Sequence, residues 1–177
     1  MNMQAVLDKA SHIKLVVFDV DGVLTNGSLI LGENGDEYKV FHAHDGLGLV
    51  MLREAGLSVA VISARSSPIV AERMAALGIE YVYQGQSDKQ TTISELMNTL
   101  DVGKNETAFV GDDLVDLPAM SRAGLAIAVA NAQPLVLERA DWVTGKSGGK
   151  GAVREVCEMV LRAKGLLEVA YQRYASK

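Results

Sequence analysis

Two aspartates, Asp19 and Asp21, come directly after an apolar run, Leu15–Phe18, and before Gly22. Side chains two positions apart on an extended segment lie on the same side, so both carboxylates can face one pocket. Two neighbouring carboxyl groups can act as a nucleophile and an acid/base when their environments separate their pKa values. An Asp-x-Asp-Gly sequence is also common as a turn, so the pair taken alone fits both interpretations.

A second acidic group, Asp112 and Asp113 with Asp116 one turn later, follows the apolar run Ala108–Val110. Adjacent acids repel one another, and burying them without a cation costs free energy. A hard divalent cation resolves this, because Mg²⁺ is typically held by one or two carboxylates together with phosphate and water. Acids that complement a helix N-terminus are the other interpretation. It accounts for Asp113 or Asp116 but not for acids at two strand ends.

Ser63 and Lys89 complete the polar groups at predicted strand ends. Ser63 follows the run Leu57–Ile62 and precedes Arg65, although a lone serine there is more often a cap or turn residue. Lys89 comes shortly after the run Tyr81–Tyr83, where a lone lysine is usually solvated. The order of these polar groups along the chain is more informative than any one of them. One group after each strand, in the order acids, serine, lysine, acids, predicts a phosphate-and-metal site.

The elements that must position these groups alternate between strand and helix. Short runs rich in valine and isoleucine predict strands buried on both faces. These runs are Leu15–Phe18, Leu57–Ile62, Tyr81–Tyr83, Ala108–Val110 and Leu125–Val129. The clearest helical stretches are Ser67–Leu77, Lys89–Leu100, Asp113–Arg122 and Ala152–Lys164. The alternation predicts an α/β fold with a doubly wound, Rossmann-like parallel sheet that binds ligands at the carboxyl ends of its strands.

One segment departs from this alternation. Ser28–Leu31 and Glu37–Phe41 are short extended runs around a glycine-containing turn, which predicts a β-hairpin inserted at about residues 28–41. The gaps between the motifs are too short for a separate cap domain. We therefore expect one domain over residues 1–177 without a cap, ending in a tail at 166–177 whose partner the sequence does not show.

Composition excludes several classes of protein. Hydrophobic residues make up 49% and charged residues 22%, which is ordinary globular usage. The net charge of −5 comes without a run of Lys or Arg, so neither a nucleic-acid nor a membrane partner is expected. We assign Cys157, the only cysteine, and His12 to structural roles. Neither a signal-peptide pattern nor an apolar run near the roughly 20 residues of a membrane helix is present, which predicts a cytoplasmic protein.

The ordered motifs resemble those of the haloacid dehalogenase superfamily, and the resemblance covers nearly the whole chain. The motifs are Asp19-Val20-Asp21-Gly22, Ser63, Lys89 and Gly111-Asp112-Asp113-Leu114-Val115-Asp116. Four longer segments resemble the 3-deoxy-D-manno-octulosonate 8-phosphate phosphatases of that superfamily. These segments are Asp21–Thr25, Tyr83–Lys89, Gly111–Asp116 and Gly148–Glu155. This resemblance implies Mg²⁺, a role in cytoplasmic lipopolysaccharide-precursor synthesis, and a homotetramer.

The resemblance implies the following catalytic roles. Asp19 attacks phosphorus to give an aspartyl-phosphate, which divides one displacement into two. Asp21 donates a proton to the leaving sugar oxygen and later deprotonates the attacking water. Ser63 and Lys89 bind the phosphoryl oxygens, where donors aimed at transition-state charge contribute most. Both Asp21 and Lys89 are thus also expected to touch the substrate.

The metal ligands follow from the same resemblance. Asp19, Asp112 and the main-chain carbonyl of Asp21 are expected to hold Mg²⁺, which offsets the repulsion between nucleophile and phosphate. Asp113 is expected to orient metal-bound water and Lys89. Asp116 is expected to hold the loop or the helix start.

Substrate recognition is implied for the segment His42-Ala43-His44-Asp45-Gly46 and for two cations, Arg65 and Arg73. Guanidinium groups suit a sugar carboxylate because their forked donors match its two oxygens. The chain departs from the family pattern at His44, where arginine is usual, and at Val50, where a basic residue is common. Both departures bear on which sugar acid is bound. Arg73 would otherwise be a solvated helix residue, and the histidines polar residues after the hairpin.

Three alternatives stay open. Within enzymes, these are a phosphatase for a nine-carbon keto-sugar acid phosphate and a broad sugar phosphatase. A receiver-type signalling domain also combines a doubly wound sheet with acids, a hydroxyl and a lysine. In such a domain, however, the adjacent acids follow the first strand and the phosphorylated aspartate lies mid-chain. Steady phosphate release would indicate an enzyme, and one stable phosphorylation a switch.

A neighbouring subunit is expected to complete the site. The apolar hairpin Ser28–Phe41 is marginally stable alone, and such apolar surface projecting from a core usually marks an interface. The loop Gly145–Gly151, with Lys146 and Lys150, is expected to reach the phosphate site of an adjacent subunit, aided by the tail. The other interpretation is that this loop is mobile and solvated.

Overall fold

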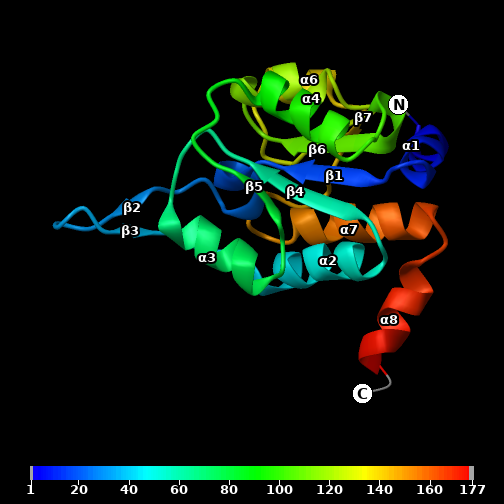
Figure 1. Cartoon of the computed structure of the whole chain (residues 1–177), viewed down its shortest axis with the longest axis horizontal. Coiled ribbons are helices and arrows are strands. Elements are labelled where there is room, and N and C mark those ends of the chain that lie inside the picture. The colour runs from blue at the N-terminus through cyan, green and yellow to red at the C-terminus, as the bar shows by residue number, and fades with distance from the viewer. Residues whose placement is uncertain (1, 176–177) are drawn as a thin grey trace.

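The computed structural model describes residues 2–175, which form a six-stranded sheet in the order β5-β4-β1-β6-β7-β8 (Figure 1). All neighbouring strands in it are parallel. The strands are β1 Leu15–Phe18, β4 Ser58–Ile62, β5 Tyr81–Tyr83, β6 Thr107–Gly111, β7 Leu125–Ala128 and β8 Trp142–Val143. The predicted α/β fold with a doubly wound parallel sheet is confirmed.

The central strand β1 is buried along its whole length. It pairs with β4 on one side and β6 on the other, so that Leu15 lies opposite Ser58 and Thr107. Parallel strands end at the same edge of a sheet, and ligands bind where neighbouring connections diverge. The residues that follow β1, β4 and β6 therefore meet at one place.

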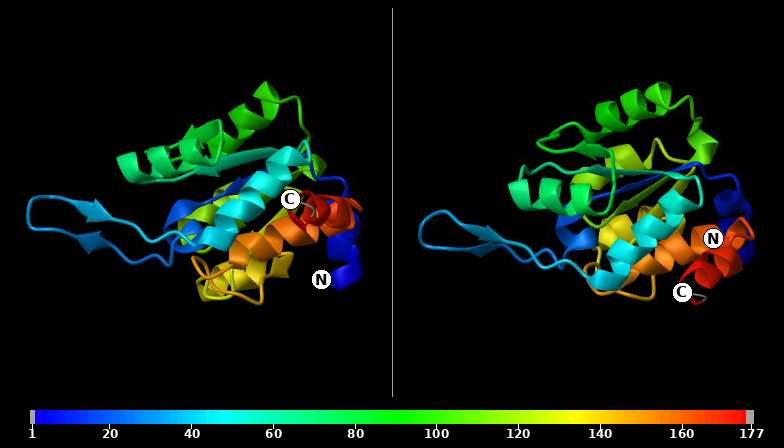
Figure 2. Two further views of the ribbon diagram at one scale, coloured as in Figure 1. Left: turned by 90° about the horizontal axis from the view of Figure 1, so that it is seen from below. Right: turned by 60° about the horizontal axis from the view of Figure 1, so that its bottom comes forward.

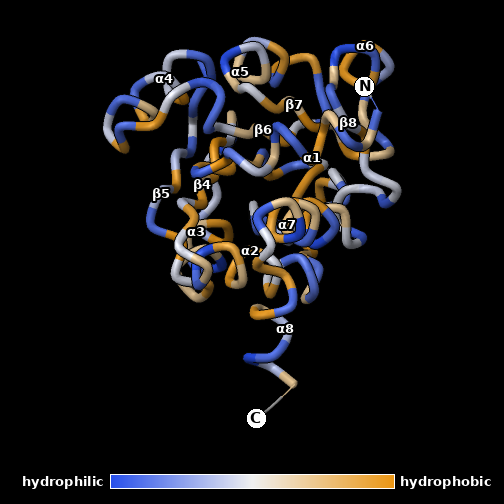
Figure 3. Tube along the Cα trace, turned by 90° about the vertical axis from the view of Figure 1, so that its right-hand side faces the viewer, coloured by the Kyte–Doolittle hydropathy of each residue, from blue (hydrophilic) through white to orange (hydrophobic). Residues whose placement is uncertain are grey.

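Helices cover both faces of the sheet. They are α1 Met3–Ser11, α2 Ala43–Glu54, α3 Pro68–Ala76, α4 Lys89–Thr99, α5 Leu117–Met120, α6 Pro134–Arg139, α7 Ala152–Ala163 and α8 Leu167–Ala175. Figure 3 shows α4, α5 and α6 on one face and α2, α3 and α7 on the other, with hydrophobic strands between them. Helix α1 packs against α7. Among the described residues, no helix is long and apolar enough to cross a membrane.

The predicted hairpin is present and projects from the body of the molecule (Figure 2). Its strands, β2 Ile30–Leu31 and β3 Glu37–Tyr38, are antiparallel. The turn closes where the amide of Gly32 donates a hydrogen bond of 2.7 Å to the carbonyl of Asp36. Most of the apolar side chains on the hairpin remain exposed.

Two predicted segments differ in detail. The stretch Asp113–Arg122 is a 3₁₀ turn, Leu114–Asp116, followed by the short α5, because Pro118 suits the first turn of a new helix. The tail forms α8, in which Arg173 and Tyr174 donate hydrogen bonds to Glu54 at the end of α2. The last two tail residues, 176 and 177, lie outside the described part of the chain.

Candidate active site

Asp19 and Asp21 lie where β1 ends and a π-helical turn, Val20–Leu24, begins. The turn is irregular at Gly22, whose φ of 109° is accessible to glycine but strained for other residues. A Cβ atom on Gly22 would lie 2.1 Å from Oδ2 of Asp112. The absence of a side chain therefore lets the backbone after Asp21 approach the acidic group at the end of β6.

Asp116 organises the loop after β6. Its Oδ2 accepts hydrogen bonds from the amides of Asp112 at 3.0 Å and Asp113 at 3.2 Å. Its Oδ1 accepts a hydrogen bond of 2.6 Å from Nζ of Lys89. Both oxygens are thus engaged within the protein, which agrees with the role of holding the loop.

Asp113 is placed differently from the expectation. Its side chain is exposed and accepts a hydrogen bond of 2.7 Å from the amide of Leu114, so it caps the following turn. The predicted contact with Lys89 belongs to Asp116 instead, because Asp116 points inward from the same loop. The helix-capping alternative therefore describes Asp113.

Lys89 is buried at the start of α4, with 3% of its surface exposed. Its Nζ donates hydrogen bonds to Oδ1 of Asp19 at 2.5 Å and to Oδ1 of Asp116. Burial acts to lower the pKa of Lys89, but the two carboxylates outweigh it and raise the pKa. The lysine is a charged donor beside Asp19, and the solvated alternative is wrong.

Asp19 and Asp112 are the carboxylates available to a cation. Burial, assisted by the charge of Asp116, raises the pKa of Asp19 to about 7. Burial, assisted by the charge of Asp19, raises the pKa of Asp112 to about 7. Carboxylate oxygens of Asp19, Asp112 and Asp116 lie within 4.8 Å of one another.

The unpaired state of Asp112 fits a metal ligand. Its Oδ1 is buried and has no hydrogen-bond partner within residues 2–175. Because both oxygens of Asp116 are engaged, Asp19 and Asp112 remain as the carboxylates that could hold a metal ion. Oxygen donors of this kind suit Mg²⁺. The third predicted ligand, the carbonyl of Asp21, belongs to the turn that packs against Asp112.

Ser63 follows β4, next to β1, and is buried. Its hydroxyl oxygen accepts a hydrogen bond of 3.3 Å from the amide of Arg65. Its own amide donates to the carbonyl of Tyr83, and its carbonyl accepts from the amide of Gln86, both at 2.9 Å. These bonds tie together the loops after β4 and β5, which brings Ser63 to the edge of the sheet that carries Lys89.

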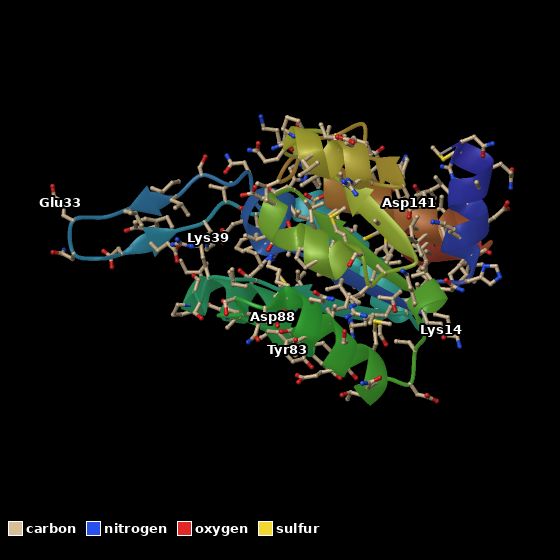
Figure 4. The ribbon with its side chains drawn as sticks, turned by 90° about the horizontal axis from the view of Figure 1, so that it is seen from above. Lys14, Glu33, Lys39, Tyr83, Asp88 and Asp141 are labelled. Carbon is tan, nitrogen blue, oxygen red and sulfur yellow. The ribbon has the colours of Figure 1, made fainter. Side chains whose placement is uncertain are left out.

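Asp21 contacts a cation that the sequence reasoning missed. Nζ of Lys39 donates to Oδ1 of Asp21 at 2.5 Å, and Nε of Arg65 lies 3.8 Å from Oδ2. Lys39 comes from the base of the hairpin (Figure 4). Alternation along an extended strand places Glu37 and Lys39 on one side and Tyr38 on the other. From that alternation, Glu37 and Lys39 could have been predicted to face the body of the protein.

The predicted substrate segment begins helix α2, and its members have different surroundings. Ala43 and His44 are exposed. Asp45 is buried and accepts hydrogen bonds from the amides of Gly151 at 3.2 Å and Arg154 at 2.8 Å. Its carboxylate caps the start of α7 and is not free for a substrate, so its predicted contact is wrong.

A second cluster forms around Arg73. A Cβ atom on Gly46 would lie 2.4 Å from Nη2 of Arg73, so the guanidinium rests on the start of α2. His42, Gly46 and Arg73 line one small pocket. Nδ1 of His42 is buried without a hydrogen-bond partner in the described chain. The structure thus groups His42 with Arg73 and places Arg65 separately, beside Asp21.

The glycine loop before α7 packs on its own chain. The amide of Gly149 donates a hydrogen bond of 2.9 Å to the carbonyl of Val23. A Cβ atom on Gly148 would lie 1.6 Å from the carbonyl oxygen of Gly22. These glycines support the turn that carries Asp21, and the expectation that the loop reaches the site of a neighbour stays a prediction.

The fold and the site together are those of a hydrolase that acts on phosphate esters. A family model for haloacid dehalogenase-like hydrolases matches residues 71–156. Curated relatives include the 3-deoxy-D-manno-octulosonate 8-phosphate phosphatases KdsC of Salmonella typhi and Escherichia coli K12. Each is 46% identical to this chain in an alignment that covers 93% of this chain and 88% of the relative.

Solved structures agree. The phosphatase of that name from Moraxella catarrhalis, in complex with magnesium, phosphate and KDO, superposes with a TM-score of 0.95 at 41% identity, covering 98% of this chain and 99% of that one. The enzyme from Yersinia pestis gives a TM-score of 0.91 at 44% identity, covering 92% and 88%. The chain belongs to the family of the 3-deoxy-D-manno-octulosonate 8-phosphate phosphatases, within the haloacid dehalogenase-like hydrolases.

Proposed function

We propose that this protein hydrolyses 3-deoxy-D-manno-octulosonate 8-phosphate to the free sugar acid and phosphate. The observation that carries the proposal is the pairing of Asp19 with buried Lys89, beside the unpartnered carboxylate of Asp112. The name of the 46% identical relatives and the molecules bound in the Moraxella structure support this substrate.

Two displacements at phosphorus carry the reaction. A carboxylate oxygen of Asp19 forms a bond to phosphorus while the bond to the sugar oxygen breaks, and Asp21 gives its proton to that oxygen. Asp21 then takes a proton from water as the water oxygen attacks the aspartyl-phosphate, which frees Asp19 and phosphate. Lys89 holds Asp19 in place and, with Ser63, binds the phosphoryl oxygens.

Mg²⁺ bound by Asp19 and Asp112 supplies positive charge that lets an anionic nucleophile approach an anionic phosphate. Asp116 contributes indirectly, since it fixes Lys89 and the amides of the loop that carries Asp112. The residues therefore divide into two groups. Asp19 and Asp112 would hold the metal, and Lys89 and Asp116 keep these two carboxylates in place.

Recognition of the sugar acid is assigned to two cations, Arg73 and Arg65. Arg73 lines one small pocket with His42, whose Nδ1 is unpartnered in the described chain, and Arg65 lies near Asp21. His44 is exposed on the same helix start. The departures at His44 and Val50 keep a nine-carbon sugar acid phosphate as the second candidate substrate.

The protein is proposed to work as a cap-less single domain in a cytoplasmic homotetramer. Leu31 and Val40 on the hairpin are 69% and 59% exposed. Association would cover this apolar surface and help exclude water from a site without its own lid.

Phosphate release from a panel of sugar phosphates, measured with Mg²⁺, tests the proposed substrate. The panel contains the eight-carbon and nine-carbon keto-acid phosphates and simple hexose phosphates. We expect the highest kcat/KM for the eight-carbon compound and a lower value when Arg73 is replaced by Met. Equal values across the panel would contradict the assignment.

A further inference from the structure

Lys39 has an almost completely buried side chain in an exposed part of the chain. Its side chain is 1% exposed, whereas its neighbours Tyr38 and Val40 are 57% and 59% exposed. Burying an ammonium group without a partner is strongly unfavourable. The partners of Lys39 therefore explain why it turns inward.

Those partners are two carboxylates. Nζ of Lys39 lies 2.5 Å from Oδ1 of Asp21 and 3.2 Å from Oε1 of Glu37. The same oxygen of Glu37 accepts a hydrogen bond of 3.1 Å from Nη2 of Arg65. Two cations and two anions thus alternate where the hairpin joins the body of the protein (Figure 4).

Lys39 is the buried contact of the Asp21 carboxylate. Within residues 2–175, the ion-pair partners of Asp21 are Lys39 and Arg65, and the Arg65 side chain is 49% exposed and more distant. The backbone at Asp21 is non-helical, so the turn does not by itself fix the side chain through regular structure. An acid/base group must nevertheless be held close to its productive geometry.

We infer that Lys39 is a positioning residue that holds the Asp21 carboxylate on the leaving-group side of the phosphate. Glu37 in turn holds Lys39. The packing of the hairpin against the body of the protein is thereby linked to the proton-transfer step, although the hairpin carries no group that reacts. The inference rests on the proposed function, because it requires Asp21 to protonate a leaving oxygen.

The test compares leaving groups in the first turnover, measured by rapid quench with Mg²⁺ present. A sugar phosphate that the wild type hydrolyses needs a proton on its leaving oxygen, whereas p-nitrophenolate leaves without one. For Lys39→Met we expect the first-turnover rate to fall roughly 10–100-fold with the sugar phosphate. The burst of p-nitrophenolate should stay within about threefold of wild type, because only the proton transfer is impaired. Lys39→Arg should recover most of the lost rate.

Two controls separate this inference from the proposed mechanism. Lys14→Met removes a lysine paired with Glu106 at 2.6 Å at the opposite end of the molecule and should leave both rates unchanged (Figure 4). Asp21→Asn should show the same leaving-group selectivity as Lys39→Met. If Asp21→Asn slows both substrates equally, the assigned role of Asp21 fails and the inference fails with it.

Other outcomes bear on Lys39 alone. If Asp21→Asn is selective and Lys39→Met is not, Lys39 only supports the hairpin and the inference is overturned. Thermal unfolding and sedimentation of each variant establish that it is folded and assembled. If Lys39→Met does not fold, Glu37→Gln decides. A selective loss with the sugar phosphate then supports the inference, and an equal loss with both substrates overturns it.

Discussion

Asp19 is a buried carboxylate and Asp112 a partly buried one, and the charged forms of both are poorly stabilised without a metal. The pKa of each is raised to about 7, first by burial and then by a neighbouring carboxylate. Lys89 offsets part of this effect at Asp19, whereas Oδ1 of Asp112 has no partner in the described chain. A divalent cation supplies the missing positive charge.

The metal-free protein should therefore lose unfolding free energy between about pH 4 and about pH 7. In this window the folded carboxyl groups keep protons that the unfolded chain has released, so stability falls as the pH rises. Mg²⁺ binds the ionised forms, and we expect the Tm increase caused by Mg²⁺ to be larger at about pH 8 than at about pH 5. Thermal unfolding in EDTA and in Mg²⁺ measures both effects.

Asp112→Asn is the matched variant for this experiment, because it removes one of the two charges and keeps the shape. Its metal-free Tm should exceed that of the wild type at about pH 8, its Mg²⁺-dependent increase should be absent, and its activity should fall roughly 10²–10³-fold. An unaltered Mg²⁺ response in Asp112→Asn would remove this residue from the metal site.

At the scale of elements, the turn Val20–Leu24 depends on close backbone contacts from two directions. Gly22 approaches the Asp112 carboxylate, and the loop at Gly148 and Gly149 rests on the carbonyls of the turn. The backbone position of Asp21 is thus set by close packing that only glycines permit, whereas its side chain is held by Lys39.

Gly22→Ala should damage catalysis more than folding. The new Cβ atom must displace the Asp112 carboxylate, so we expect activity to fall at least about 100-fold and Mg²⁺ to lose its effect on Tm. The positive φ alone should reduce the unfolding free energy by about 1–2 kcal/mol. Gly56→Ala is the control, since Gly56 has a φ of 86° and open space around it. A loss of stability without a loss of activity is expected there, and equal activities of the two variants would contradict the account.

Sequence reasoning placed the strands and the groups that follow them, because both depend on local patterns. Ser63, Lys89 and Asp112 each follow a strand, and parallel topology alone brings such positions together. Helix α2 was not foreseen, because Gly46 and Gly48 lower its helix propensity. They are explained only by close contacts, Gly46 with Arg73 and Gly48 with Arg154.

The partners of Asp45 and the role of Lys39 were missed for a related reason. The amide partners of Asp45 on α7 are more than a hundred residues away in sequence. Lys39 pairs with Asp21 at the base of the hairpin, and no local pattern shows how the hairpin packs on the body of the protein. Alternation along the strand places Lys39 on the side of Glu37, but the distant partners of Lys39 and Asp45 are not contained in a single-sequence pattern.

At the scale of the whole molecule, the hairpin is the most prominent projection (Figure 2). Leu29, Ile30 and Leu31 expose 49%, 46% and 69% of their surfaces, and Tyr38 and Val40 on the other arm of the hairpin are also exposed. Monomeric soluble proteins rarely expose such contiguous apolar surface, which supports association through this segment.

Sedimentation at assay concentration should give a tetramer for the wild type. Leu31→Asp combined with Val40→Asp should produce smaller species, because charged groups oppose burial of the hairpin. Leu135→Asp is the control, as Leu135 is an exposed apolar residue on α6, and it should leave the assembly intact. A fully active wild-type monomer would contradict the proposed assembly.

The central claim is that Asp19 is the group that attacks phosphorus, and trapping of the covalent intermediate tests it most directly. The Asp21→Asn variant, in which hydrolysis of the intermediate is slowed, is mixed with Mg²⁺ and p-nitrophenyl phosphate, whose leaving group needs no proton, and quenched in acid. Mass spectrometry of the digested protein then locates the phosphate. The account predicts phosphate on the peptide that contains Asp19, and none when Asp19→Asn is added to the variant. Phosphate on another residue, or steady turnover by Asp19→Asn alone, would contradict it.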